Sequence, residues 1–151
     1  MGDAARNARI MIVDDNVDVA DTLSISLSRM GYQTTVFYEP LQAYDVFKKE
    51  PGRWDVVLTD QVMGPHRGLD PIGRLRGLRP NGIYILMTGY DENLTAGAAI
   101  EKGASAYFLK PLECSELAAT MDRLLLAARR NTPINITAES REKVPQERRA
   151  S

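Results

Sequence analysis

Trp54-Asp55-Val56-Val57-Leu58-Thr59-Asp60-Gln61-Val62-Met63 is the stretch of the chain that decides the fold. Its apolar run, from Val56 to Leu58, is too short for a helix and is bounded by polar residues, a pattern typical of a strand buried on both faces. Such a strand carries the carboxylate of Asp60 to its C-terminal end. The stretch therefore predicts a buried strand that presents an acid at one edge of a sheet.

Three other short apolar runs end at polar residues in the same way. They are Ile10 to Val13 before Asp14-Asp15, Tyr84 to Met87 before Thr88, and Ala106 to Leu109 before Lys110-Pro111. In an open parallel α/β sheet the C-terminal strand ends share one edge, and ligands bind in the crevice there. We therefore expect three acids, a hydroxyl and an ammonium group to meet at one place.

Helical patterns separate these strands. The expected helices run from the cap Asn16 to the stop Gly31, from Pro40 to the residue before Pro51, from the cap Asp70 to Leu78, over Asp91 to Lys102, and from about Glu113 to Arg130. Gln33 to Tyr38 has a polar start and reads as an edge strand. Five alternations of strand and helix predict an α/β fold with a parallel sheet and right-handed crossovers.

Three acids in one cluster repel one another, so a functional reason for placing them together is needed. Two unit charges about 4 Å apart repel by roughly 4 kcal/mol at an effective dielectric constant of about 20, and Asp14, Asp15 and Asp60 would crowd in this way. A hard cation removes that cost, and Mg²⁺ is usual where few carboxylates meet a phosphate; Mn²⁺ is a possible substitute. An Asp carboxylate beside a metal can attack phosphorus to give an aspartyl phosphate. Thr88 and Lys110 would then contact the phosphoryl oxygens.

This arrangement resembles the receiver domain of two-component response regulators. The matching pieces are Asp14-Asp15, Asp60, Thr88-Gly89 and Lys110-Pro111, each directly after its strand. The sequence around Asp60 and Thr88 looks most like that of receivers attached to hybrid histidine kinases. The resemblance covers residues 9 to 130 and implies a flavodoxin-like, doubly wound, five-stranded parallel sheet of order 2-1-3-4-5 with five helices.

The resemblance also implies a role for each residue. Asp60 would be the phosphoacceptor, Asp15 would bind Mg²⁺ directly, Asp14 would act through water, and the carbonyl of Val62 would be the third protein ligand. Thr88 and Lys110 would contact the phosphoryl group. Thr88 and Tyr107 would form the switch, in which Tyr107 turns inward, and Lys110-Pro111 would be a cis peptide.

The two ends of the chain differ from its centre in composition. Residues 1–8 are polar and are expected to be flexible, and residues 131–151, rich in Glu, Arg, Lys and Ser, are expected to be disordered. A polar tail of this length is not expected to fold into an output domain. The signal would therefore be passed on through protein contacts, or the chain is a fragment of a longer protein.

Composition narrows the function classes. The 151 residues carry a formal net charge of -1, which gives no argument for direct nucleic-acid or membrane binding. The single cysteine, Cys114, rules out an internal disulfide and suits a reducing compartment. No apolar stretch approaches the roughly 18 residues of a spanning helix, so a cytoplasmic protein is expected.

Several alternatives stay open. A haloacid-dehalogenase-type phosphatase also uses a strand-end Asp, but it carries a second Asp two residues later, where this chain has Val62. A nucleotide or flavin domain would want a glycine-rich loop after the first strand, where Asp14 and Asp15 stand. A degenerate receiver that acts only through protein contacts remains. His66 reads as an ordinary loop residue, and Cys114 as a small filler.

The favoured hypothesis is a phosphoacceptor signalling module rather than an enzyme with external turnover. Its partners would be a histidine kinase or histidine phosphotransfer protein and a downstream protein target, and it would be a monomer or a phosphorylation-dependent dimer. The resemblance places Val62 and Tyr90 beside the path of an attacking water. Since neither is suited to orienting that water, slow self-dephosphorylation is expected.

Overall fold

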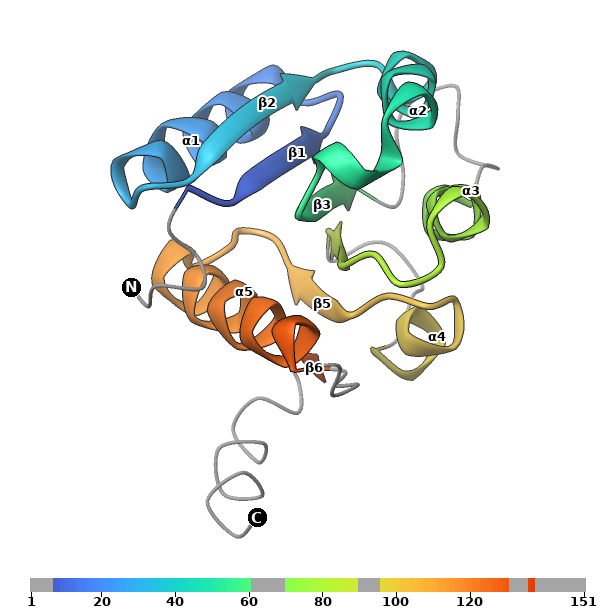
Figure 1. The fold of residues 1–151 in the computed structure, drawn as a ribbon. Coiled ribbons are helices and arrows are strands. Elements are labelled where there is room, and N and C mark those ends of the chain that lie inside the picture. The colour runs from blue at the N-terminus through green and yellow to red at the C-terminus, as the bar shows by residue number, and fades with distance from the viewer. Residues whose placement is uncertain (1–6, 61–69, 90–95, 131–135, 138–151) are drawn as a thin grey trace, which may run out of the picture.

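Six parallel strands form one sheet in the order β2-β1-β3-β4-β5-β6 (Figure 1). The structure is a computed structural model that describes residues 7–60, 70–89, 96–130 and 136–137. The strands are β1 (Arg9–Val13), β2 (Gln33–Phe37), β3 (Val56–Asp60), β4 (Tyr84–Thr88), β5 (Ala106–Leu109) and β6 (Ile136–Thr137). The expected order of the first five strands, 2-1-3-4-5, is confirmed.

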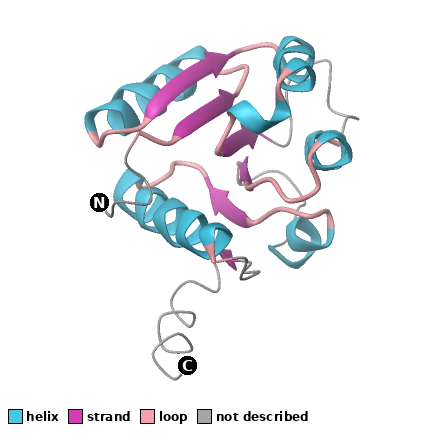
Figure 2. Cartoon of the chain, viewed as in Figure 1, coloured by secondary structure: helices cyan, strands magenta, loops and turns pink. Residues whose placement is uncertain are grey.

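The helices cover both faces of the sheet (Figure 2). They are α1 (Val17–Arg29), α2 (Pro40–Lys49), α3 (Pro71–Leu78), α4 (Ala96–Glu101) and α5 (Cys114–Arg129), with a short 3₁₀ turn, η2 (Pro51–Arg53). Their order and bounds match the expected helices closely, except that residues 91–95 of the fourth lie outside the described residues and that η2 was not expected.

Local capping chemistry explains where two of the helices begin. The Asn16 side chain accepts a hydrogen bond from the Val19 amide at 3.2 Å, and the Asp70 side chain accepts one from the Gly73 amide at 3.1 Å. Each bond satisfies a backbone donor that the first helical turn leaves unpaired. Gly31, with φ 104°, turns the chain from α1 towards β2, a conformation that favours glycine.

Two apolar layers pack against the sheet because side chains of a strand alternate between its faces. One layer joins α1 and α5 to the sheet through residues such as Leu27, Leu117 and Met121. The other joins α2, α3 and α4 through residues such as Phe47 and Ile72. With both faces covered, β3 and β4 are buried along their whole length, so polar groups on them are placed rigidly.

The chain ends differ in part from the expectation. Asn7 donates its amide to the Gly31 carbonyl at 3.1 Å and Ala8 is buried, so the anchored part begins before residue 9. β6 lies inside the segment expected to be disordered. Its pairing with β5 depends on the free edge of the sheet, which composition does not reveal.

Candidate functional site

Asp14 and Asp15 follow β1 directly, yet they differ in burial. Asp14 is fully buried: its backbone amide donates to the Phe37 carbonyl at 3.0 Å, and its Oδ1 accepts a hydrogen bond from the Asn16 amide at 3.0 Å. Asp15 is exposed to solvent. The expected pair of acids is therefore present as one fixed, buried carboxylate and one accessible carboxylate.

Asp60 is the last residue of β3 and is 4% exposed. Because β1 and β3 are neighbours, with Val13 opposite Thr59, the acids at the two strand ends are brought together. One carboxylate oxygen from each of Asp14, Asp15 and Asp60 lies within 4.8 Å of the other two. The structure thus places the three predicted acids in one cluster.

Lys110 bridges two of these acids. Its Nζ lies 2.8 Å from Asp14 Oδ2 and 3.0 Å from Asp60 Oδ2. Burial by itself lowers the pKa of Lys110, but the hydrogen bonds and the charges of Asp14 and Asp60 together outweigh it, so the net pKa lies above its usual value. The repulsion between the acids is therefore compensated in part, because an ammonium group lies between two of them.

The segment around Lys110 is held to β4. The Lys110 amide donates to the Thr88 carbonyl at 2.8 Å, and the peptide bond from Lys110 to Pro111 is cis, as expected. Thr88 ends β4, next to β3, and is fully buried. Thr88 and Lys110 therefore reach the same edge of the sheet as the acids.

Tyr107 lies on β5 and is 1% exposed, within the apolar layer that contains Leu86, Ala99 and Ala104. The aromatic side chain is thus buried in this structure, and its role in a switch stays a prediction. Val62, His66 and Tyr90, which the sequence also singles out, lie outside the described residues.

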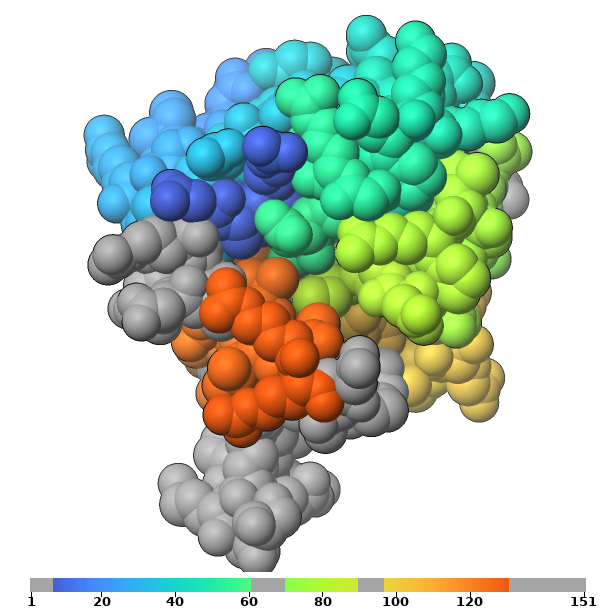
Figure 3. All heavy atoms as spheres, in the orientation of Figure 1, coloured from blue at the N-terminus to red at the C-terminus, as the bar shows by residue number. Residues whose placement is uncertain are grey.

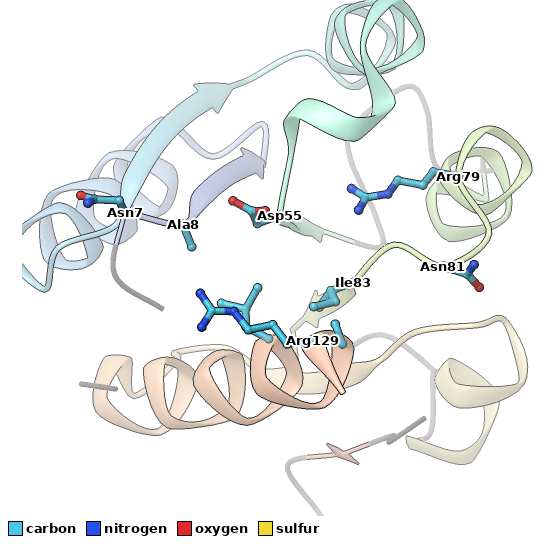
Figure 4. A pocket seen from close by; sticks show the side chains of 9 residues that line it. Asn7, Ala8, Asp55, Arg79, Asn81, Ile83 and Arg129 are labelled. Carbon is cyan, nitrogen blue, oxygen red and sulfur yellow. The ribbon is translucent and has the colours of Figure 1, made fainter. Parts of the chain in front are cut away.

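A pocket of about 300 Å³ lies away from these residues, at the end of the sheet where β1, β3 and β4 begin. Asp55, Arg79 and Arg129 are among the side chains that line it (Figure 4). In the space-filling view, α5, in orange, lies close to the blue start of the described chain (Figure 3). None of the predicted site residues lines this pocket, so its volume does not identify the functional site.

The acidic cluster fits a hard divalent cation. Carboxylate oxygens are the ligands that Mg²⁺ prefers, and the exposure of Asp15 leaves room for the waters that Mg²⁺ keeps. The ammonium of Lys110 neutralises only part of the charge of three acids. The donor set and its remaining negative charge therefore suit such an ion.

Comparison with known proteins gives the same picture. A model of the "Response regulator receiver domain" matches residues 10–122. The sporulation initiation phosphotransferase F of Bacillus subtilis is 32% identical over 119 residues, which are 79% of this chain and 94% of that protein. The DNA-binding transcriptional regulator NtrC of Azospirillum brasilense is 33% identical over 128 residues, 83% of this chain. The chain spans only about a quarter of the length of the NtrC relatives (25% and 28%).

Solved structures agree on the fold. A response regulator receiver domain from Clostridium thermocellum has a TM-score of 0.75 at 22% identity and covers 81% of this chain and 97% of its own. A response regulator from Burkholderia pseudomallei, crystallised with a phosphorylated aspartic acid, calcium and citrate, has a TM-score of 0.68 at 26% identity, covering 82% and 72%.

The relatives named here lend no support to a special similarity to hybrid histidine kinases, since they are a transcriptional regulator and a sporulation phosphotransferase. Within the described part of the chain, no helix combines the length and the apolar character needed to cross a bilayer. The strand order, the acidic cluster with its lysine and the match over residues 10–122 lead to one conclusion: this chain belongs to the response regulator receiver domain family of two-component signalling.

Proposed function

We propose that Asp60 accepts a phosphoryl group from a phosphohistidine partner, a histidine kinase or a histidine phosphotransfer protein. The observation that carries the proposal is the juxtaposition of Asp14, Asp15 and Asp60 with Lys110 at one sheet edge. In the transfer, the phosphorus–nitrogen bond of phosphohistidine breaks, its electron pair returns to the imidazole, and an Asp60 carboxylate oxygen forms the new bond to phosphorus.

Asp14, Asp15 and Asp60, with the Val62 carbonyl, would hold Mg²⁺. When bound, Mg²⁺ supplies positive charge that offsets the negative charge of the phosphoryl oxygens. The burial of Asp14 and its bond from the Asn16 amide fix one donor, whereas the exposed Asp15 is accessible to an entering ion.

Lys110 and Thr88 act on the phosphoryl group itself. The Lys110 ammonium already lies 3.0 Å from Asp60 Oδ2, so it is placed to pair with an oxygen of a group bonded to that carboxylate. The product carries about -2 charge with three acceptor oxygens. Thr88 moves towards those oxygens, and the buried position of Tyr107 is the one that this movement favours, so the population of a protein-binding face changes.

Residues 9 to 130 act as a signalling module. This module loses the phosphoryl group slowly and does not hydrolyse external phosphate esters. The output is a protein contact rather than direct nucleic-acid binding by these residues. NtrC carries a DNA-binding name, but this chain corresponds to only a quarter of that protein.

The test is incubation with acetyl phosphate and Mg²⁺, followed by intact-mass measurement. We expect the wild type to gain one phosphoryl group and Asp60→Asn to gain none. Asp45→Asn, which removes an exposed acid from α2, is the matched control and should behave as the wild type. Chelation of the metal should prevent the gain.

The mass measurements distinguish a phosphoacceptor at Asp60 from the alternative functions. A wild type that never gains mass would identify a degenerate receiver that acts only through protein contacts. A phosphoryl group that appears on Asp60→Asn as readily as on the wild type would place the acceptor elsewhere and overturn the assignment of Asp60.

A further inference from the structure

β6 extends the sheet beyond its five main strands. It runs parallel to β5, with Ala106 opposite Ile136 and Tyr107 opposite Thr137. Figure 1 shows it beside the C-terminal end of α5. Without β6, β5 would be the outer strand on that side, and an outer strand presents unpaired backbone groups to any other extended chain.

The hydrogen bonds of β5 identify which of its backbone groups face that edge. The Lys110 amide donates to the Thr88 carbonyl of β4 at 2.8 Å, so Lys110 faces β4. Alternate residues of a strand direct their backbone groups to opposite neighbours, so Ala106 and Phe108 also face β4, while Tyr107 faces β6. Tyr107 is 1% exposed, so its backbone groups need a partner other than water.

We propose that β5 carries a strand-addition surface and that residues 136–137 of the same chain cover it. Strand addition to a free sheet edge is a general mode of peptide recognition, with affinity from main-chain hydrogen bonds. Here the covering strand occupies the outward backbone groups of Tyr107 and excludes other extended strands. The inference concerns the β5 edge alone and does not depend on phosphorylation of Asp60.

The chain's own segment is the occupant because it is close by covalent connection. Arg130 caps α5, and only residues 131–135 separate it from Ile136. A linker this short gives an effective concentration of about millimolar, which a separate molecule reaches only in concentrated solution. The cover is therefore intramolecular and independent of protein concentration.

The first test is amide hydrogen exchange in the full chain with Ile136→Pro. In a parallel pair, a residue that faces its neighbour bonds to the residues before and after its register partner, so the Tyr107 amide faces the Ile136 carbonyl and the Ile136 amide faces the Ser105 carbonyl. Proline at position 136 lacks that amide. We expect exchange at Tyr107 to become about tenfold faster or more, since its amide loses a hydrogen-bonded cover.

Two controls accompany this test. The Ala106 and Phe108 amides, which face β4, should keep their protection in the same sample, and Ile136→Ala, which retains the backbone amide, should behave as the wild type. Unchanged exchange at Tyr107 in Ile136→Pro would overturn the cover. Loss of protection at Ala106 and Phe108 as well would mean that the sheet edge has unfolded, and would equally count against a separable cover.

The second test asks whether the uncovered edge accepts a strand. A peptide with the sequence of residues 133–140, Pro-Ile-Asn-Ile-Thr-Ala-Glu-Ser, is added to the Ile136→Pro chain. We expect it to restore protection at Tyr107, whereas the same peptide with proline in place of its second isoleucine should not. Failure of the first peptide would overturn the strand-addition surface.

Sedimentation of the wild type, measured together with exchange, shows whether β6 covers β5 of its own chain or of a second copy. An intramolecular cover predicts protection at Tyr107 that does not change on dilution. Protection that is lost on dilution together with a dimer would show exchange of β6 between copies, which would overturn the intramolecular form of the proposal.

Discussion

The ammonium group of Lys110 lies within 3.0 Å of both Asp14 and Asp60, and its side chain is 20% exposed. Removing it would leave two buried carboxylates without a cation. Such a loss costs about 1–3 kcal/mol, and partial exposure of Lys110 favours the lower end of that range. We therefore predict that Lys110→Ala destabilises the metal-free chain by about 1–2 kcal/mol in urea unfolding.

The matched control is Lys48→Ala, an exposed lysine on α2, which should change the free energy of unfolding by no more than about 0.5 kcal/mol. Equal effects of the two substitutions would show that the ion pairs of Lys110 do not contribute to stability.

Tyr84 makes the stability of the folded protein depend on pH in the alkaline range. Its hydroxyl lies 3.1 Å from the Leu75 carbonyl and 2.5 Å from the Arg79 carbonyl, and burial raises its pKa from 10.0 to about 12, although Arg79 and Arg76 lower it in part. Below pH 10 the phenol is protonated in the folded and the unfolded chain. Between pH 10 and 12 only the unfolded chain ionises, so stability falls as pH rises through this window.

We predict that Tyr84→Phe makes this alkaline fall shallower. Tyr32 and Tyr44, whose pKa values are also raised to about 12, would still contribute to it. At pH 7 the same variant should lose about 0.5–1.5 kcal/mol, the net contribution of a hydrogen bond. Urea unfolding at several pH values measures both effects, and an unchanged slope would exclude Tyr84 as its source.

At the scale of elements, α1 begins beside the acidic cluster, and its cap links the two. The Asn16 side chain accepts from the Val19 amide, while the Asn16 backbone amide donates to Asp14 Oδ1. A substitution at this position removes only the first bond. We predict that Asn16→Ala lowers the free energy of unfolding by about 1 kcal/mol.

Asn16→Ser should retain most of the stability, because serine is also a good N-cap residue. Equal losses in Ala and Ser, measured by thermal unfolding, would indicate that the residue acts through contacts other than the cap.

For the whole molecule, the acidic cluster predicts coupling between metal binding and folding. Mg²⁺ at ten times its dissociation constant should stabilise the wild type by about 1.4 kcal/mol through mass action. Thermal unfolding with and without Mg²⁺, at equal ionic strength, measures this shift.

Asp15→Asn should lose much of the Mg²⁺ effect, because it removes the accessible carboxylate of the cluster while the Lys110 ion pairs stay intact. A wild type whose unfolding temperature ignores Mg²⁺ would contradict the metal site, even though the acids lie together.

The sequence by itself determined the elements and the residues at their ends. Short apolar runs identified β1, β3, β4 and β5, and local capping chemistry at Asn16 and Asp70 placed two helix starts. These signals are local, because a strand end or a cap depends on residues within a few positions. The strand order came from the family resemblance and then brought Asp14 and Asp60 together.

Only the tertiary structure decided how these residues interact. Asp14 is buried and Asp15 is exposed, although they are adjacent and chemically identical. Lys110 pairs with Asp14 as well as Asp60, and Ile136–Thr137 pairs with β5 although its composition predicts disorder. Both depend on contacts between distant parts of the chain, where a buried charge or an open sheet edge takes the partner that the fold brings within reach.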